Sequence, residues 1–436
     1  MSSLAEVRLW GSTIGAVSID AGRPARFEYD RAFVASGIEV SPLTMPLREG
    51  AYVFPDLNPG SFHGLPGLLA DSLPDRYGQA LIDVWLAGQG RSADSFDAVE
   101  RLCYTGRRGV GALEFAPARG PRATRTHRLH VAALVELASE VLSDRAELVA
   151  SLAAGRREQA MRDILSVGTS AGGARAKAVI AWNRLTGEVR SGQLDAGPDF
   201  EYWLLKFDGV KGNKDREPLA DPDGFGAIEL AYSHMARDAG ITMTECRLME
   251  ENGRRHFMTR RFDRDADGRK RHMQSLAALA HFDFKQAGAY SYEQAFQVIQ
   301  ALGLDAAAVR QQFRRMLFNV IGRNQDDHVK NIAFLMDRTG KWELSPAFDV
   351  AYSYNPTGDW TAQHQMSLAG KRDGFTVEDF RQVGRVARLK RGEAKRILDD
   401  VCAVVSEWPR YAEDVAVDQN DIRRITPALR LRFTSE

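Results

Sequence analysis

Apolar positions along this chain change between helical and strand spacing. In residues 306–321 they recur every three or four positions, which predicts a helix over Ala306–Ile321 that ends near Gly322. The same spacing predicts further helices along the whole chain, and from residue 291 onward helices dominate. The predicted helices are Val131–Leu142, Glu158–Leu165, Gly224–Ala239, Tyr292–Leu302, Val377–Val383 and Gly392–Trp408, with another starting at Asp75.

Shorter apolar runs have the length of strands. We expect strands at Lys177–Trp182, Tyr202–Phe207, 332–336 and 342–344, a strand that enters a polar segment within 255–264, and an N-terminal hairpin around Gly11-Ser12. Together these elements predict an α+β fold in three parts. They are a small β-rich N-terminal subdomain (1–118), a β-rich lobe (119–265) and an all-helical C-terminal lobe (266–436).

Composition narrows the class of protein. The chain has 436 residues, 44% hydrophobic and 27% charged, as expected of a globular protein with a large core. Its 58 basic and 58 acidic residues balance, which argues against strong nucleic-acid binding by this chain alone. Three widely separated cysteines, no signal peptide and no apolar run near the roughly twenty residues of a membrane span predict a cytoplasmic location and no membrane partner.

The segment 322–331 carries the most specific chemistry. Asp326 and Asn331 are five positions apart, the spacing of the catalytic Asp and the metal-holding Asn in protein kinases. One carboxylate would accept the acceptor hydroxyl proton, and one amide oxygen would hold Mg²⁺. His328 and Lys330 would offset charge on the migrating phosphoryl group. No His-Arg pair precedes Asp326, and His328 stands where a Lys is usual; an ordinary solvated turn has similar residues.

A second candidate metal ligand follows a predicted hairpin. Asp349 lies 23 residues beyond Asp326, and in kinases a loop, a hairpin and an Asp deliver the second ligand of the metal. Phe348 precedes this Asp, whereas the kinase motif has its apolar residue after the Asp. A buried Asp that caps a loop is the alternative interpretation.

Upstream, residues 166–177 combine small residues with two cations. Small residues allow backbone N–H groups to approach phosphate oxygens, and Arg175 and Lys177 add positive charge. Neither a Walker A loop nor G-x-G-x-x-G is present. A glycine loop that opens a hairpin is how kinases cover ATP, but a flexible surface loop has the same composition.

Two further segments fit a nucleotide lobe. Lys206 closes an apolar run, where kinases place the lysine that holds the α- and β-phosphates; a strand-edge lysine reaching water is the alternative. Residues 255–264 are at the position of the kinase hinge, where Phe262 would lie against adenine and Asp263 would reach the ribose. A strand that ends in a charged turn explains the same residues.

The order of these parts resembles the HipA family, the serine/threonine kinase toxins of bacterial toxin–antitoxin pairs. The resemblance rests mainly on Ser-Ala-Gly-Gly-Ala-Arg-Ala-Lys (170–177) and Asp-Asp-His-Val-Lys-Asn (326–331), and runs the length of the chain. It implies a two-lobed, protein-kinase-like fold, with nucleotide bound by 119–265 and catalysis in 266–436.

The resemblance also implies roles for residues. Asp326 becomes the catalytic base, and Asn331 and Asp349 become the Mg²⁺ ligands. Ser170 matches a serine that these kinases autophosphorylate, which switches the kinase off. Some members have Glu where this chain has Arg260, so only a backbone contact to adenine is expected there. The implied ATP-binding residues are Ser170, Ala171, Gly172, Gly173, Ala174, Lys177, Lys206, Arg260, Phe262, Asp263 and His328.

Partners follow from the resemblance alone. It implies a small helix-turn-helix antitoxin of the HipB kind, operator DNA reached through that antitoxin, and a substrate such as glutamate-tRNA ligase or another aminoacyl-tRNA synthetase. Two other hypotheses stay open. One is a kinase-like scaffold that serves in operon repression without catalysis; the other is a kinase whose acceptor is a small alcohol or a lipid.

Overall fold

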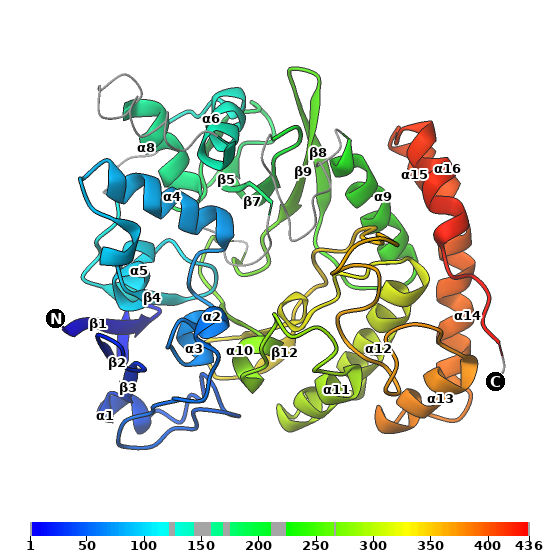
Figure 1. The fold of residues 1–436 in the computed structure, drawn as a ribbon, viewed down its shortest axis with the longest axis horizontal. Coiled ribbons are helices and arrows are strands. Elements are labelled where there is room, and N and C mark those ends of the chain that lie inside the picture. Colours follow the sequence, from blue (N-terminus) through cyan, green and yellow to red (C-terminus); the bar gives the residue numbers. More distant parts are fainter. Residues whose placement is uncertain are drawn as a thin grey trace. The chain divides into compact units, whose positions relative to one another are not determined.

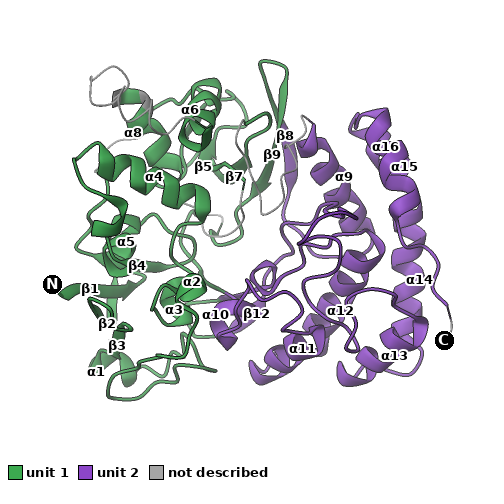
Figure 2. Ribbon diagram, viewed as in Figure 1, with its two compact units in different colours: residues 1–223, 249–274, 336–341 green, residues 224–248, 275–335, 342–436 purple. Residues whose placement is uncertain are grey.

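The computed structural model describes residues 2–121, 127–143, 158–168, 175–210, 224–265 and 267–434. The chain forms two compact units, each assembled from separate stretches of sequence (Figure 2). Unit 1 comprises Met1–Asp223, Met249–Gln274 and Met336–Lys341. Unit 2 comprises Gly224–Leu248, Ser275–Leu335 and Trp342–Glu436.

Unit 1 begins with a four-stranded sheet in the order β3-β2-β1-β4. Its strands are β1 (Ser2–Leu9), β2 (Ser12–Asp20), β3 (Arg26–Tyr29) and β4 (Leu113–Ala116). Trp10 and Gly11, which join β1 to β2, both have positive φ (51° and 87°), as in a two-residue turn of type I′ whose twist matches the strands. The predicted hairpin is therefore present.

Short helices follow the first three strands of this sheet (Figure 1). They are α1 (Arg31–Val34), α2 (Pro59–Phe62), α3 (Gly67–Ala70), α4 (Arg76–Ala87), the 3₁₀ turn η1 (Ala93–Ser95) and α5 (Ala98–Thr105). Helix α4 starts where the sequence predicts, because the Asp75 side chain accepts the Gly78 N–H at 2.8 Å and caps the helix.

The second sheet of unit 1 has the order β6-β5-β7-β9-β8. Its strands are β5 (Lys177–Trp182), β6 (Val189–Ser191), β7 (Glu201–Lys206), β8 (Cys246–Glu251) and β9 (Arg254–Arg260). Helices α6 (Val131–Ser143) and α8 (Glu158–Val167) and helix α4 share one apolar core with β5 and β7. The N-terminal part of the chain therefore contributes to the core beneath this sheet.

Unit 2 is mainly helical. Its helices are α9 (Phe225–Asp238), α10 (Leu276–Ala280), α11 (Tyr292–Ala301), α12 (Ala306–Ile321), α13 (Val377–Val386), α14 (Glu393–Ser406), α15 (Trp408–Asp414) and α16 (Gln419–Ile425), with 3₁₀ turns η2 (Val329–Asn331) and η3 (Thr426–Ala428). It also contains the neighbouring strands β11 (Ala333–Met336) and β12 (Trp342–Leu344). Strand β10 (His272–Ser275) contains a point where the chain passes between units.

Most predicted elements are confirmed, and helix α12 has the predicted bounds. The helix predicted at Gly392–Trp408 is confirmed as α14, which ends two residues earlier, at Ser406, and α15 begins at Trp408. Pro409 lies in the first turn of α15, where its missing N–H costs nothing, whereas inside a continuous helix it would remove a hydrogen bond. Among the described residues, no helix combines the length and apolar character needed to cross a membrane.

Candidate active site

The end of helix α12 directs the chain into the segment with the candidate catalytic residues. Gly322 closes the helix by donating its N–H to Phe318 O at 2.8 Å. A Cβ at this position would lie 2.9 Å from that oxygen, so a glycine fits best. Tyr232 donates its hydroxyl to Gly322 O at 2.7 Å, and Arg323 has a positive φ of 57°. The chain therefore leaves the helix in a fixed direction.

Asp326 and Asn331 are held together by the backbone of this loop. The Asn331 side chain donates its Nδ2 to Asp326 O at 2.8 Å, and the Asn331 N–H donates to His328 O at 2.8 Å. Because the amide nitrogen is used inside the loop, the amide oxygen is the end of the side chain that can face a cation. The five-residue spacing thus forms a closed loop that leaves the Asn331 amide oxygen outside these two hydrogen bonds.

The segment with Asp349 is tied to the same loop. Asp349 has a positive φ of 51°, a conformation that Asp adopts more readily than most residues. Its carbonyl accepts Asn324 Nδ2 at 3.3 Å, and the same nitrogen donates to Asn319 Oδ1 of helix α12 at 3.0 Å. Asn324 therefore joins the two candidate metal-binding segments to the preceding helix.

Ser353 holds the backbone N–H groups of Gln325 and Asp326 in place. Its hydroxyl oxygen accepts the N–H groups of Gln325 at 2.7 Å and Asp326 at 3.0 Å, and donates to Asn324 Oδ1 at 3.1 Å. The Ser353 N–H itself donates to Arg323 O at 3.1 Å. One hydroxyl thus satisfies two backbone donors of a loop that makes no helix or sheet hydrogen bonds of its own.

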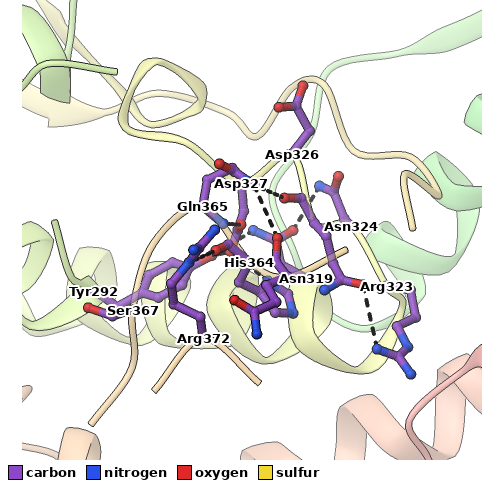
Figure 3. A network of polar contacts seen from close by, with 12 residues as sticks. Tyr292, Asn319, Arg323, Asn324, Asp326, Asp327, His364, Gln365, Ser367 and Arg372 are labelled. Carbon is purple, nitrogen blue, oxygen red and sulfur yellow. Dashed lines mark hydrogen bonds and ion pairs between the residues drawn. The ribbon is translucent and has the colours of Figure 1, made fainter. Parts of the chain in front are cut away.

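The side chains of Asp326 and its neighbour Asp327 point in different directions (Figure 3). The Asp326 side chain is 36% exposed, and its Oδ1 accepts the indole Nε1–H of Trp360 at 2.7 Å. His328 Nε2 lies 3.9 Å from the same oxygen. A half-buried carboxylate with two nitrogen groups nearby is suited to accept a proton from a hydroxyl.

Asp327, by contrast, is fully enclosed by hydrogen-bond donors. Its Oδ2 accepts the Tyr292 hydroxyl at 2.6 Å and lies 2.8 Å from His364 Nδ1, while its Oδ1 accepts the Gln365 N–H at 2.7 Å. Asn319 Nδ2 donates to the Tyr292 oxygen at 3.0 Å. Burial alone would raise the pKa of Asp327, but the adjacent His364 and the three donors outweigh it and lower that pKa. Asp327 therefore stays ionised inside unit 2.

His328 and Lys330 both lie near Phe284. Lys330 Nζ is 4.5 Å from the centroid of the Phe284 ring, a cation–π distance, and the His328 ring meets that ring edge-on at 6.1 Å. His328 Nδ1 is buried and has no hydrogen-bond partner among the described residues. Both basic residues therefore pack against one aromatic ring in unit 2.

In unit 1, Lys177 forms a buried ion pair. Its Nζ lies 3.3 Å from Asp75 Oδ2, and both side chains are 3% exposed. Asp75 is also the residue that caps helix α4. The cation predicted to face phosphate is thus paired with a carboxylate at the start of that helix. Residues 170–174, which hold the predicted phosphate contacts and Ser170, lie outside the described residues.

Lys206 is the register partner of Lys177 on the adjacent strand β7. It is half-buried, and its Nζ is 5.6 Å from the centroid of the Phe257 ring on β9. Arg260, at the end of β9, is exposed, and its Nη1 lies 3.9 Å from Glu201 Oε1. Phe262 is half-buried. Lys206 and the predicted hinge therefore occupy neighbouring strands of one sheet.

Asp263 is the centre of a buried charge cluster. It accepts from Arg261 Nε at 2.8 Å, from Arg264 Nη1 at 2.7 Å and from the Gly111 N–H at 2.8 Å. Burial would raise the pKa of Asp263, but the two guanidinium groups and the backbone donor lower it strongly. The carboxylate predicted to reach a ribose thus holds the hinge segment against the N-terminal part of the chain.

A second set of contacts joins the same two regions. Lys270 Nζ donates to Arg107 O at 2.6 Å and lies 3.0 Å from Glu114 Oε1 on β4. Burial, only partly offset by Glu114, lowers the pKa of Lys270 to about 8. Trp10 Nε1 donates to Lys270 O at 2.8 Å. Asp263 and Lys270 are therefore fastened to the N-terminal part of the chain by side chains and backbone alike.

Comparison with protein families gives two matches along this chain. The HipA N-terminal domain matches residues 5–116, and the HipA-like C-terminal domain matches residues 169–408. The chain belongs to the HipA family. No curated protein matches its sequence significantly.

Solved structures agree with the family assignment. The HipA of the Shewanella oneidensis MR-1 toxin–antitoxin system, solved with HipB and its operator DNA, matches with a TM-score of 0.68 at 17% identity, over 97% of this chain and 94% of that one. The mixed fold expected of a HipA protein is thereby confirmed. The Helicobacter pylori proinflammatory kinase CtkA also matches, at 12% identity over 52% of this chain and 92% of that one, but its TM-score of 0.29 is too low for an inference.

As a HipA protein, this chain is expected to use ATP and a divalent metal ion, and the residues of unit 2 fit that requirement. Mg²⁺ is usually held by one or two protein oxygens together with phosphate oxygens and waters. The amide oxygen of Asn331 and the carboxylate of Asp349 are hard oxygen ligands of that kind, and Asn324 links the Asp349 backbone to the start of the loop that holds Asn331.

Sequence reasoning missed the residues that fix the candidate catalytic loop. None of Tyr292, Ser353, Trp360 and His364 lies within a recognisable motif, and each is at least 27 positions from the residue that it contacts. One signal was available in the Asp326-Asp327 pair. Where the fold buries one of these two adjacent carboxylates, that carboxylate requires hydrogen-bond donors from elsewhere in the chain.

Proposed function

We propose that this protein is a Mg²⁺- and ATP-dependent serine/threonine protein kinase that acts as the toxin of a toxin–antitoxin pair. The observation that carries the proposal is the arrangement in unit 2. A half-buried Asp326 accepts the Asn331 side-chain amide at its backbone carbonyl, and Asn324, two positions before Asp326, donates to the carbonyl of Asp349. This set provides one proton acceptor and two metal ligands, which phosphoryl transfer requires.

Each residue then has a distinct role. Asp326 accepts the proton of the acceptor hydroxyl, and Asn331 with Asp349 holds the metal ion. The bound Mg²⁺ would neutralise phosphate charge. Lys330 and His328 offset charge beside the transferred phosphoryl group, and Lys206 contacts the non-transferred phosphates. The proposed acceptor is a translation component such as an aminoacyl-tRNA synthetase.

The substitution Asp326→Asn tests the catalytic assignment. It keeps the size of the side chain and the Trp360 contact but removes the proton acceptor, so transfer from γ-labelled ATP to protein in a cell extract should fall by about 100-fold or more. Nucleotide affinity, measured with a fluorescent ATP analogue, should stay within about twofold. Asp399→Asn is the matched control, because Asp399 is an exposed residue of α14 paired with Lys395.

Equal transfer by Asp326→Asn and the wild-type protein would contradict the assignment. Label found only in small molecules would instead favour a small alcohol or a lipid as acceptor. In the same reactions, mass spectrometry should find phosphate on Ser170, and Ser170→Ala should remove it. A phosphate-free segment 166–177 under active conditions would exclude autophosphorylation at this site.

We also propose a HipB-like helix-turn-helix antitoxin as partner, with operator DNA bound through it. The match over 97% of this chain to a HipA solved with HipB and operator DNA supports this proposal. Co-purification with such an antitoxin, followed by a gel-shift assay on its operator, tests it. If Asp326→Asn still forms the DNA complex while the wild-type protein transfers no phosphate, the protein is a scaffold in operon repression.

A further inference from the structure

The carboxylate of Asp326 is oriented by a residue that lies outside the recognised motif. Trp360 Nε1 donates to Asp326 Oδ1 at 2.7 Å. The final torsion of an aspartate has a broad energy profile, so an exposed carboxylate samples many orientations unless a donor fixes one oxygen. The indole is a rigid donor with one N–H. It therefore determines which way the second oxygen of Asp326 faces.

The position of Trp360 is in turn set by the residue next to Asp326. Asp327 accepts the Gln365 N–H at 2.7 Å and lies 2.8 Å from His364 Nδ1. The Gln365 side chain then donates to Trp360 O. His364 and Gln365 are both buried. The inward carboxylate of Asp327 thus anchors the segment 360–365 whose indole reaches the outward carboxylate of Asp326.

A second pair of contacts closes this arrangement. Gln325 Nε2 donates to Ala362 O at 3.4 Å, and Gln365 Nε2 donates to Gln325 O at 3.4 Å. Both contacts join Gln325, two positions before Asp327, to the segment 360–365 that Asp327 holds. Residues 325–327 and 360–365 therefore form one hydrogen-bonded structure within unit 2, although more than thirty positions separate them in sequence.

We propose that Trp360 is a positioning residue for the transfer reaction: its indole N–H holds the Asp326 carboxylate in the orientation that accepts the acceptor hydroxyl proton, and Asp327 holds Trp360. This inference rests on the proposed kinase function. The proton leaves the acceptor hydroxyl for Asp326 as that oxygen bonds to the transferred phosphorus and the bond to the leaving phosphate oxygen breaks. Trp360 takes no part in this bond exchange and acts through its hydrogen bond to the carboxylate.

The substitution Trp360→Phe separates orientation from packing, because it keeps an aromatic ring and removes the N–H. We expect kcat for phosphoryl transfer to fall roughly 10- to 100-fold, since misplacement of a reacting group has effects of this size. Nucleotide affinity should change less than about twofold.

Trp408→Phe is the matched control. Trp408 is a fully buried tryptophan of unit 2, and its Nε1 has no hydrogen-bond partner among the described residues. The same substitution there removes ring volume without removing a described hydrogen bond, so stability should fall while kcat stays unchanged. The proposal is wrong if kcat falls equally in both variants. It is also wrong if Trp360→Phe raises kcat, because that result would mean that the contact inhibits the reaction.

A measurement without nucleotide tests the contact itself. The chain has seven tryptophans, so a ¹⁵N-indole spectrum contains at most seven side-chain N–H signals. The signal that is missing in Trp360→Phe belongs to Trp360. In Asp326→Asn that signal should move upfield more than the others, because an amide oxygen is a weaker acceptor than a carboxylate.

The two measurements distinguish failure of this inference from failure of the kinase proposal. If the Trp360 signal does not shift in Asp326→Asn, the inference is wrong, whether or not the protein transfers phosphate. A responsive signal in a wild-type protein that transfers no phosphate refutes the kinase proposal, and with it the positioning role of Trp360. A responsive signal together with a selective loss of kcat in Trp360→Phe supports both.

Discussion

The buried pair of Lys177 and Asp75 gives the most direct test of how unit 1 is stabilised. Both side chains are 3% exposed and their charged atoms are 3.3 Å apart. Asp75 also accepts the Gly78 N–H as the cap of helix α4. Asp75→Asn keeps an oxygen for the cap but removes the negative charge, whereas Asp75→Ala removes both. The two variants therefore separate the ion pair from the helix cap.

The expected losses follow from the burial of the pair. Removing one partner of a buried ion pair costs about 3 to 5 kcal/mol, because a charge is left in a medium of low polarity. We therefore expect Asp75→Asn to lower the free energy of unfolding by about 3 kcal/mol. Loss of a helix cap costs about 1 kcal/mol, so Asp75→Ala should be less stable than Asp75→Asn by about that amount.

Urea unfolding, followed by circular dichroism without nucleotide, measures these differences. The double variant Lys177→Met, Asp75→Asn provides the control, because it removes both charges and should recover about 2 kcal/mol relative to Asp75→Asn. The reasoning fails if Asp75→Asn is as stable as the wild-type protein. It also fails if the double variant is no more stable than the single one.

Two further predictions concern unit 2 and the start of the predicted phosphate loop. Asp327 has a lowered pKa in the folded protein, so its contribution to stability is present above its unfolded pKa, near 4, and is lost as the pH falls. The difference in unfolding free energy between the wild-type protein and Asp327→Asn should therefore shrink from pH 7 to pH 3. A difference that stays constant over this range would contradict the prediction. Gly168→Ala should lower the free energy of unfolding, measured by heat or urea, by about 1 to 3 kcal/mol, because the new Cβ would lie 2.1 Å from Leu81 Cδ1 and 2.9 Å from Ile164 O. Gly88→Ala is the control, because the nearest atom to its new Cβ is 3.5 Å away, and its free energy of unfolding should not change.

Elements whose signal is local could be predicted from the sequence. Helix α12 and strand β5 have the expected bounds, because the spacing of apolar side chains and the flanking glycines determine them directly. Strand β8 (Cys246–Glu251) was not predicted. Only one of its six residues is fully buried, so its apolar pattern is weak, and its pairing within the sheet defines it.

The candidate site divides in the same way. The spacing of Asp326 and Asn331 was sufficient to predict that one loop holds both residues. The pairing of Lys177 with Asp75 could not be predicted, because the partner is about one hundred positions away and no pattern connects them. For the same reason the contact of Trp360 with Asp326 could not be predicted. A hydrogen bond between distant side chains depends on the tertiary fold, and residue spacing contains no information about it.

The buried cluster around Asp263 has a practical consequence for dissecting this protein into fragments. Gly111, Arg107 and Glu114 belong to the region matched by the N-terminal family domain, and Asp263 and Lys270 belong to the region matched by the C-terminal one. A truncated protein that starts near residue 169 would leave Arg261, Arg264 and Lys270 in place but discard the groups that Asp263 and Lys270 meet across the boundary. Solubility and nucleotide binding of such a fragment would reflect the severed cluster and not the intrinsic properties of the C-terminal domain.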